Sequence, residues 1–546
     1  MNTSYKVRMV FVFFLFCFGY LLIIATLYMI QIKQRNFFMH LGRQQYTVTV
    51  KQLPPRGIIY DRYNTILALN QDILSAFILP NQLEKVERVE PFLKKYFPQA
   101  LARLHANPQA PFLYIKRKLS QQDIYTIESS GINDIKLLKE PSRFYPCKAL
   151  SHIIGITDID NNGLFGVELM HNADLSGSPT TFCLEKDARS GHFYFKKELM
   201  NQGVEAQPLH LTIDSDLQFL IYQEIKKTVR HFNAQEGAVL VVDPASGQIL
   251  AMAQYPVINP HNFASIEQEK TKNKIVTDAY EPGSVMKAFT ALALLEEDLV
   301  DPDELIDCEN SLSAVINGFH FSTVKAHGII PFAQVIQRSN NIGIAKTAVR
   351  LGPLLYDHYV RLGFGKKTSF EWPGQQSGFV NPPKRWSRSS LIALSFGYEI
   401  RTTLLQLAQA FSIIANEGRL VPFTVVKNDL FINGSPRIAN DNGLPLYSPH
   451  ALIMLKAILN KNTATPVSGY SIWGKTGTAN LVIDGQYSRE HNIYTFVGVI
   501  EKDTYKRLIV TFIKDAQRKD LRAAGVAVPL FDRVVQDLLL REKMTN

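Results

Sequence analysis

Hydrophobic residues recur with a helical or a strand period along most of the chain, but one N-terminal stretch is apolar throughout. Residues 9–30 read MVFVFFLFCFGYLLIIATLYMI and contain neither a charge nor a proline. As a helix, about 22 residues rise ~33 Å, which is enough to cross the hydrocarbon core of a bilayer. A cleaved signal peptide would have a shorter apolar region and a small-residue cleavage site, and residues 31–35 (QIKQR) offer no such site. The pattern therefore predicts one uncleaved membrane anchor.

Between the anchor and residue 210, short periodic segments are separated by turn signals. The sequence Pro54-Pro55-Arg56-Gly57 ends the first of these segments, because proline stops a regular element. The patterns predict, in chain order, a helical stalk (36–50), a short strand (58–62), an amphipathic helix (82–104), a strand (112–115), and a helix capped by Ser120 that runs to Ile127.

From residue 211 onward the pattern changes to that of a sheet with helices. Apolar runs at 238–242 and 248–253 flank the turn Pro244-Ala245-Ser246-Gly247, which predicts a β-hairpin. Two further strands are predicted at 495–500 and 508–513, followed by a helix at 528–540. About 220 residues of mainly helical pattern lie between the hairpin and these strands. We therefore expect an α+β fold, with an antiparallel sheet built from both ends, helices on its faces and an inserted helical lobe.

Composition narrows the protein class. The 546 residues exceed one domain, and 46% hydrophobic with 20% charged residues excludes disordered and fibrous proteins. Four cysteines exclude a disulfide scaffold; Cys17 lies in the predicted anchor, so at most one pair is open to Cys147, Cys183 and Cys308. The net charge of +10 is concentrated in residues 1–210, which carry 24 basic and 17 acidic side chains. This excess favours anionic lipid, and the chain has no basic run interleaved with aromatic residues that would indicate nucleic acid.

The first candidate for chemistry is Ser284 with Lys287, in the sequence EPGSVMK that opens an apolar helix at 288–295. Residues three apart share one face of a helix, and the apolar neighbours predict that Lys287 is buried. Burial disfavours the ammonium form, so a neutral Lys287 would be able to take the hydroxyl proton of Ser284. The alternative is an N-cap serine with a lysine whose charged end reaches solvent, since Ser-x-x-Lys is frequent by chance.

Two more segments are candidates. Ser339-Asn340-Asn341 reads either as a site loop or as a polar loop capping a helix from Ile342. In Trp473-Gly474-Lys475-Thr476-Gly477-Thr478-Ala479 the glycines indicate a close approach to a strand backbone. Gly469, Gly474 and Lys475 also match the letters of a phosphate-binding loop, but no strand precedes and no helix follows them, so this reading fails.

Taken together, Ser-x-x-Lys, Ser-x-Asn and Lys-Thr-Gly, with their first residues 55 and then 136 positions apart, resemble the penicillin-binding proteins and serine β-lactamases. The resemblance covers about residues 5–540. It includes motifs typical of class B penicillin-binding proteins: Arg56–Arg62, Arg143–Pro146, Gly166-x-Glu168, Thr212–Gln218 and Phe396–Gln406. Ser339–Gly343 (SNNIG) resembles the septal, FtsI-type subgroup more than the elongation type.

The resemblance implies a peptidoglycan D,D-transpeptidase with a cytoplasmic tail (1–8), a transmembrane anchor (9–30), an elongated pedestal (31–210) and a transpeptidase domain (211–546). It implies Ser284 as nucleophile, Lys287 as its base, Ser339 as proton relay and Lys475 as positive charge. The implied substrate-binding residues are Asn341, Thr476, Gly477 and Thr478, and the backbone N–H groups of Ser284 and Thr478 would form an oxyanion hole. No metal or organic cofactor is implied.

The implied partners are peptidoglycan stem peptides, β-lactams, a SEDS-family glycosyltransferase and other division proteins of the cytoplasmic membrane, with the catalytic domain on the extracytoplasmic side. An elongation-type transpeptidase, a β-lactamase or β-lactam sensor, and a catalytically silent division scaffold remain open. The sequence departs from the family at Val285-Met286 and at Lys325, where relatives often carry an aspartate. His320 and His327 are expected at surface or packing positions rather than on a metal.

Overall fold

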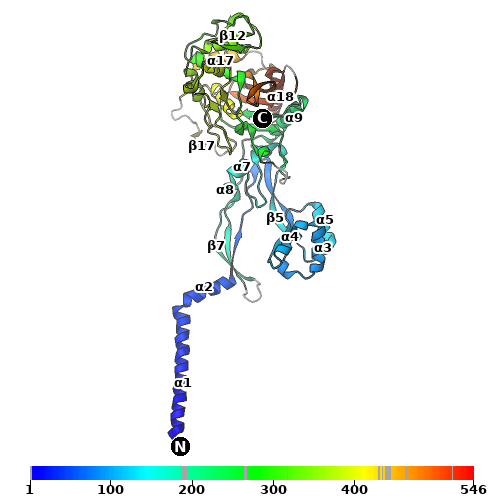
Figure 1. Cartoon of the computed structure of the whole chain (residues 1–546), viewed down its shortest axis with the longest axis vertical. Coiled ribbons are helices and arrows are strands. Elements are labelled where there is room, and N and C mark those ends of the chain that lie inside the picture. The colour runs from blue at the N-terminus through cyan, green and yellow to red at the C-terminus, as the bar shows by residue number, and fades with distance from the viewer. Residues whose placement is uncertain are drawn as a thin grey trace. The chain divides into compact units, whose positions relative to one another are not determined.

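The computed structural model describes residues 3–186, 193–262, 267–316, 318–427, 431–432, 435–436, 444–460, 465–518 and 521–545. The chain forms two compact units (Figure 1). The first consists of Met1–Arg56 and Ser176–Gln207, and the second of Gly57–Leu175 and Pro208–Asn546. The predicted pedestal range therefore contributes to both units.

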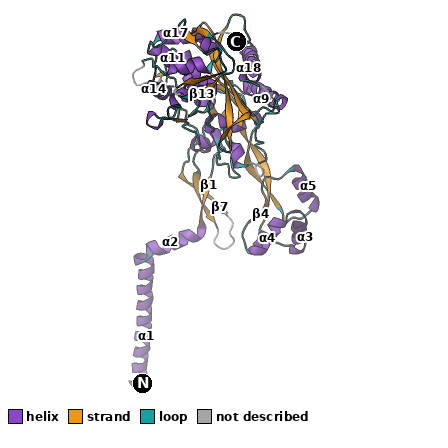
Figure 2. Ribbon diagram, turned by 45° about the horizontal axis from the view of Figure 1, so that its top comes forward, coloured by secondary structure: helices purple, strands orange, loops and turns teal. Residues whose placement is uncertain are grey.

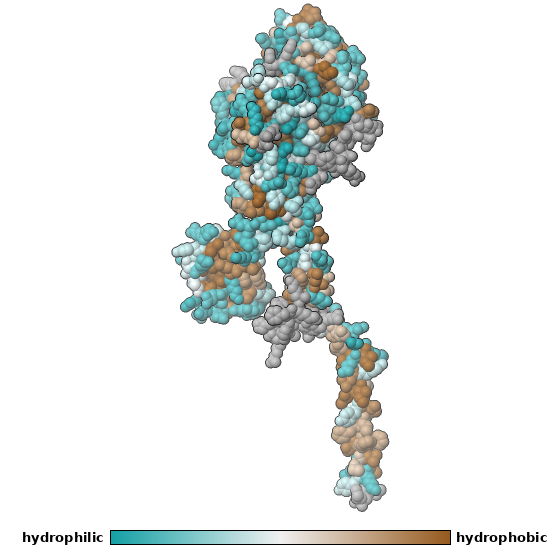
Figure 3. Space-filling model, turned by 180° about the vertical axis from the view of Figure 1, so that it is seen from behind, coloured by the Kyte–Doolittle hydropathy of each residue, from teal (hydrophilic) through white to brown (hydrophobic). Residues whose placement is uncertain are grey.

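The first unit begins with the predicted apolar helix. Helix α1 (Thr3–Tyr28) continues through a π-helical turn, Met29–Lys33. Apolar side chains are seen along it in Figure 3, and in the span Tyr5–Lys33 they are not buried by the rest of the chain. It is the one helix among the described residues that is long and apolar enough to cross a membrane.

Beyond this helix the chain forms α2 (Arg35–Tyr46) and then β1 (Thr47–Gln52). The predicted stalk helix is therefore wrong over residues 47–50, where the β-branched sequence TVTV favours an extended backbone. Strand β1 pairs with β6 (Thr180–Lys186), and β6 pairs with β7 (Phe193–Asn201), both antiparallel.

The second unit contains a smaller sheet followed along the chain by the larger one. Its strands are β2 (Ile59–Tyr60), β3 (Ile66–Ile78), β4 (Leu113–Lys116), β5 (Lys136–Phe144) and β8 (Leu209–His210). β3 pairs antiparallel with β2, β4 and β5, whereas β2 and β8 are parallel. The strands predicted at 58–62 and 112–115 are thereby confirmed as β2 and β4.

The helices beside this sheet correct one prediction and confirm another. The helix expected over 82–104 is two helices, α3 (Val86–Tyr96) and α4 (Pro98–Ala106). Pro98 causes the break, because proline cannot donate the helical hydrogen bond and restricts Phe97 before it. Helix α5 (Gln121–Ser130) begins as predicted, with Ser120 and Asp123 forming a capping box.

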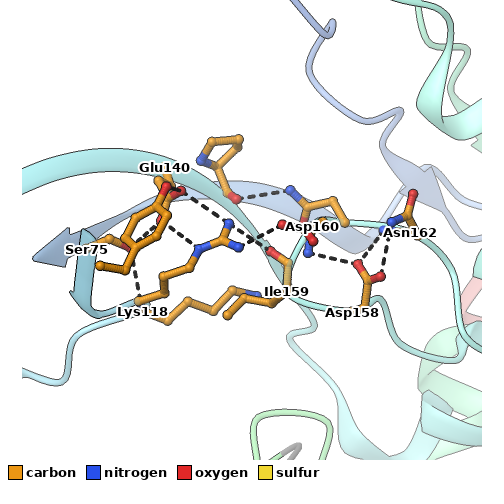
Figure 4. A network of polar contacts seen from close by, with 11 residues as sticks. Ser75, Lys118, Glu140, Asp158, Ile159, Asp160 and Asn162 are labelled. Carbon is orange, nitrogen blue, oxygen red and sulfur yellow. Dashed lines mark hydrogen bonds and ion pairs between the residues drawn. The ribbon is translucent and has the colours of Figure 1, made fainter. Parts of the chain in front are cut away.

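A polar network connects the strands of this region with a nearby turn (Figure 4). Glu140 on β5 accepts hydrogen bonds from Ser75 on β3 and from Tyr114 on β4. It also accepts two 3.2 Å bonds from Arg117. The same guanidinium donates a 2.7 Å hydrogen bond to Asp160. The arginine therefore links the turn at residues 158–162 to Glu140 on β5, which in turn bonds to β3 and β4.

The larger sheet has the strand order β10-β9-β21-β20-β19, all antiparallel. Its strands are β9 (Glu236–Val242), β10 (Ile249–Tyr255), β19 (Ser471–Ile483), β20 (Gln486–Lys502) and β21 (Tyr505–Lys514). Figure 2 shows this sheet with helices around it. The predicted hairpin and both C-terminal strands are confirmed, although the latter are longer than expected.

The sheet is buried on both faces because its side chains alternate between two cores. Val239 and Val241 pack in one core with α9 (Ser215–His231) and α18 (Ala523–Thr545). Leu240 and Val242 pack in the other core, which includes α16 (Leu404–Ala415). The α+β class and the insertion of a helical lobe between the strands are confirmed.

The lobe contains the helices that position the candidate residues. They are α11 (Lys287–Glu296), α12 (Phe332–Gln337), α13 (Asn341–Ala348), α14 (Leu354–Arg361), α15 (Ser390–Ser395), α16 and α17 (Pro449–Leu459). Short strands accompany them: β11 (Leu305–Asp307), β12 (Ser313–Ile316), β13 (Phe319–Ser322), β14 (Ile329–Pro331), β15 (Phe379–Val380), β16 (Ile400–Arg401), β17 (Phe431–Ile432) and β18 (Ser435–Pro436). Short helices elsewhere are α6 (Ser151–Ile154), α7 (Gly166–Met170), α8 (Asn172–Ser176) and α10 (Lys274–Thr277).

Candidate active site

Ser284 lies in a 3₁₀ turn, Gly283–Met286, that leads directly into α11. Gly283 has a φ of +56°, and a Cβ added to it would lie 2.8 Å from the carbonyl oxygen of Thr478. Its N–H donates to the carbonyl of Gly397 at 3.2 Å. Because only glycine fits this conformation between two backbones, the turn holds the half-buried Ser284 in one place.

Lys475, Thr476, Gly477 and Thr478 lie on β19, at the edge of the larger sheet. A Cβ added to Gly477 would lie 2.5 Å from the carbonyl oxygen of Pro282. The close backbone approach that the glycine indicated is therefore made by the turn that carries Ser284. This packing, which also brings the Val285 side chain against Gly477, places the turn that carries Ser284 beside the strand.

Lys287 is completely buried, as the apolar helix predicts. Its Nζ lies 2.6 Å from both the carbonyl oxygen of Ser339 and Oδ1 of Asn341, and 3.1 Å from Oγ of Ser339. Burial, and then the charge of Lys475, hold the pKa of Lys287 well below its ordinary value. Nζ is the donor toward these oxygens; when neutral, the amine keeps two hydrogens to donate and has one lone pair that can accept a proton.

The side-chain amide of Asn341 has one orientation in which both its nitrogen and its oxygen form hydrogen bonds. Its Nδ2 donates to the carbonyl of Ser322 at 2.6 Å, which turns Oδ1 toward Lys287. The backbone N–H of Asn341 donates to Oγ1 of Thr323 at 3.2 Å. Thr323 is buried and holds the start of α13, a role that no local pattern in the sequence indicates.

The loop around Ser339 both caps a helix and contributes side chains to the site, so both interpretations of the Ser-Asn-Asn sequence apply. Asn340 is the N-cap of α13 and accepts from the N–H of Gly343 at 2.8 Å, so the capping role is real. Ser339, with a φ of +54°, and Asn341 flank this cap and both face Lys287. Asn340 Nδ2 also lies 3.1 Å from Nδ1 of His327, a buried side chain, which confirms the packing position expected for this histidine.

Lys475 approaches Ser339 from the strand. Its Nζ donates to Oγ of Ser339 at 3.1 Å and to the carbonyl of Thr476 at 3.2 Å. Burial lowers the pKa of Lys475 to about 8. The Ser339 hydroxyl therefore lies between two lysine nitrogens, and protons can pass along this short chain of groups.

The two threonines of β19 share one face of the strand, since side chains alternate along it. Oγ1 of Thr478 accepts a 3.1 Å hydrogen bond from the N–H of Ala523, at the start of α18. This bond occupies an acceptor position and leaves the hydroxyl hydrogen of Thr478 available for a ligand. Both threonines are half-buried.

Two further positions near the site, Lys325 and Gly397, have surroundings that the sequence alone does not indicate. Lys325 is exposed, and nothing in the structure explains the lysine at this position. Gly397 belongs to a recognised motif, but its contact with Gly283 depends on residues 114 positions apart in the chain. Within the described ranges, no group of three or more His, Cys, Asp and Glu side chains is arranged to hold a metal ion.

Comparison with known proteins identifies the family of this chain. Residues 237–536 match the model of the penicillin-binding protein transpeptidase domain. The chain belongs to this family. Residues 51–190 match the penicillin-binding protein dimerisation domain, so both parts that the resemblance implied are present in the predicted order.

Relatives extend the match over nearly the whole chain. A probable peptidoglycan D,D-transpeptidase, PbpC, of Pseudomonas aeruginosa is 30% identical over 97% of this chain and 94% of its own length. The peptidoglycan D,D-transpeptidase FtsI of Escherichia coli K12 is 29% identical, covering 89% of this chain and 83% of the relative. The predicted membership of the class B penicillin-binding proteins is confirmed.

Solved structures support the same fold. Penicillin-binding protein 3 of Mycobacterium tuberculosis, complexed with aztreonam, has a TM-score of 0.67 at 24% identity and covers 90% of this chain and 97% of its own. The transpeptidase domain of penicillin-binding protein 3 from Burkholderia pseudomallei has a TM-score of 0.53 at 28% identity, covering 61% of this chain and 96% of its own.

Proposed function

We propose that this chain cross-links peptidoglycan as a serine D,D-transpeptidase, with Ser284 as the nucleophile. The observation that carries the proposal is the buried Lys287 amine, which starts the helix after Ser284 and contacts both Ser339 and Asn341. The family and the relatives named peptidoglycan D,D-transpeptidases support an acyl-transfer enzyme. β-Lactams are expected to acylate the same serine.

In the acylation step, Oγ of Ser284 adds to the carbonyl carbon between the two terminal D-alanines of a donor stem peptide. The lone pair of Lys287 takes the hydroxyl proton. The carbonyl oxygen becomes an oxyanion that the backbone N–H groups of Ser284 and Thr478 stabilise. Lys475 adds positive charge beside Ser339, and the hydroxyl groups of Thr476 and Thr478 bind the terminal carboxylate.

The tetrahedral intermediate then collapses and the bond to the last D-alanine breaks. Ser339 gives its proton to the departing nitrogen and regains one from the Lys287 ammonium, 3.1 Å away. Asn341 holds the donor amide while the serine ester persists. The amine of a second stem peptide attacks this ester, loses a proton to the same relay, and releases Ser284, which completes the cross-link.

We also propose where the reaction takes place. The helix Tyr5–Lys33 makes the chain a single-pass membrane protein, and the transpeptidase domain belongs on the extracytoplasmic side, where peptidoglycan lies. The Ser339–Gly343 sequence and the FtsI relatives favour septal wall synthesis. By resemblance to the class B penicillin-binding proteins, a SEDS-family polymerase and other division proteins are the expected partners.

A fluorescent penicillin tests this function. Membranes containing the wild-type chain should show one labelled band near 61.7 kDa, and Ser284→Ala should remove it. Ser313→Ala, which changes an exposed serine on β12, is the matched control and should label normally. An acyl-enzyme that lasts many minutes supports a transpeptidase, whereas rapid turnover would support a β-lactamase instead.

A further inference from the structure

The turn Gly283–Met286, which carries the proposed nucleophile, is called the nucleophile turn. Glu281, three residues before Ser284, connects three segments that meet beside it. Its Oε1 accepts a hydrogen bond from the hydroxyl of Tyr487 and another from the backbone N–H of Glu399, both at 3.1 Å. Tyr487 lies on β20, and Glu399 directly precedes β16. One carboxyl oxygen therefore holds a strand and a loop against the segment that leads to Ser284.

Aromatic and amide contacts extend this connection to β19. The ring of Tyr398 lies edge-on to that of Tyr487, with centroids 5.3 Å apart and an interplanar angle of 89°. The Tyr398 hydroxyl donates to Oδ1 of Asn480 at 3.4 Å, and Asn480 Nδ2 donates to the carbonyl of Ser488 at 2.5 Å. We call Glu281, Tyr398, Asn480 and Tyr487 the clasp. It joins the outer end of the β19–β20 hairpin to the loop at residues 396–399.

The elements joined by the clasp are those that enclose Ser284. The loop contacts the nucleophile turn through the 3.2 Å hydrogen bond from Gly283 to Gly397, and β19 contacts it at Thr478 and Gly477. In the proposed mechanism, the N–H groups of Ser284 and Thr478 must face one oxyanion, so the spacing of turn and strand decides the rate. A shift of about 1 Å in such a spacing can cost roughly a hundredfold in rate.

We propose that Glu281 is a positioning residue that sets the spacing between Ser284 and the Thr478 backbone through the clasp. This inference rests on the proposed function of Ser284. It assigns to Glu281 no contact with substrate: the carboxyl acts through Tyr487, Tyr398 and the backbone of residue 399. Loss of its acceptor oxygen should therefore slow acylation rather than weaken the binding of the penicillin.

The surroundings of Glu281 indicate which chemical form supports the clasp. Its second oxygen, Oε2, is buried and has no hydrogen-bond partner in the described part of the chain. Burial raises the pKa of Glu281, and the negative charge of the Glu399 carboxylate raises it further. The hydrogen bonds from Tyr487 and from the Glu399 backbone, and the charge of Arg401, lower this pKa by less. A neutral carboxyl keeps its carbonyl oxygen as acceptor for both donors, and a glutamine amide presents the same oxygen.

The test separates the acylation rate constant from the dissociation constant of the initial penicillin complex, using the full-length protein. Glu281→Ala should lower the rate constant roughly tenfold or more and leave the dissociation constant within about twofold. Glu281→Gln should keep both within about twofold of wild type. The matched control is Glu296→Ala at the other end of α11, a half-buried glutamate bound to the N–H and hydroxyl of Ser448, which should acylate at the wild-type rate.

Thermal unfolding of each variant shows whether the variant is folded. If Glu281→Ala does not fold, Tyr487→Phe takes its place, because it removes a single hydroxyl from a side chain that is 52% exposed; it should lower the acylation rate constant several-fold. Wild-type acylation rates in Glu281→Ala or its substitute would overturn the positioning role, and so would Glu281→Gln acylating as slowly as Glu281→Ala. Failure of the wild type itself to be labelled on Ser284 would instead overturn the proposed function.

Discussion

At the scale of single residues, the Ser339 hydroxyl is shared by two buried lysines, each with its Nζ 3.1 Å away. Burial lowers the pKa of both, to about 8 for Lys475, and the charge of Lys475 lowers that of Lys287 further. The proposed base works when neutral and Lys475 works when charged. Penicillin acylation should therefore rise with pH as Lys287 loses its proton and fall as pH passes about 8 and Lys475 becomes neutral. Because the two lysines titrate together, the apparent pKa of each limb of the profile belongs to the pair and not to one residue.

Lys475→Met tests which residue gives which limb. Without the neighbouring positive charge the pKa of Lys287 rises, so the ascending limb should move to higher pH, while the descending limb disappears. The measurement is the acylation rate constant between about pH 5 and 10, in a range where thermal unfolding shows the protein folded. An unchanged descending limb in the variant would contradict the assignment to Lys475.

The motifs of the sequence mark the residues of the site but not the contacts that hold them. Ser284, Ser339 and Lys475 are visible because three short motifs occur in order. Thr323 and Glu281 act through partners that lie 18 and more than 100 positions away, and a buried threonine or a single glutamate has no local pattern. Such contacts depend on the packing of distant segments, which the spacing of apolar residues does not describe.

At the scale of elements, the approach of β19 to the nucleophile turn depends on Gly477. A Cβ there would lie 2.5 Å from the backbone oxygen of Pro282, so strand or turn must move. Gly477→Ala should lower the acylation rate constant roughly a hundredfold. Gly525→Ala is the control: it lies in α18, with open space around the added methyl, and should acylate normally with slightly raised thermal stability. Near-normal acylation by Gly477→Ala would contradict a rigid approach.

The smaller sheet offers a second test at this scale. Arg117→Ala removes the two bonds to Glu140 and the bond to Asp160, which leaves a half-buried carboxylate with less compensation. We expect the free energy of unfolding to fall by about 1–2 kcal/mol, measured by urea denaturation. Lys116→Ala, which breaks a more exposed pair with Asp123, should cost less than about 1 kcal/mol. Equal losses in the two variants would contradict a special role for the network.

The elements also show where hydrophobic pattern is sufficient and where it is not. The hairpin of β9 and β10 is predictable because both strands are buried apolar runs with a turn between them. The helix expected over 82–104 kept its period but was broken at Pro98, a backbone effect that the period does not contain. Strand β1 follows α2 without a turn signal, so only the β-branched character of residues 47–50, and no break in the pattern, indicates where the helix ends.

At the scale of the whole molecule, we expect the exposed apolar helix to determine membrane attachment and the transpeptidase domain to determine acylation, each independently of the other. The side chains of Tyr5–Lys33 are not buried by any described part of the chain, whereas the larger sheet and the lobe bury their own cores. Deleting residues 1–34 should therefore move the protein from the membrane to the soluble fraction and leave the penicillin acylation rate constant within about twofold. The measurement compares the membrane fractionation and the penicillin labelling of the full-length and truncated forms. If the truncated protein still unfolds cooperatively but no longer acylates, the anchor takes part in forming the site.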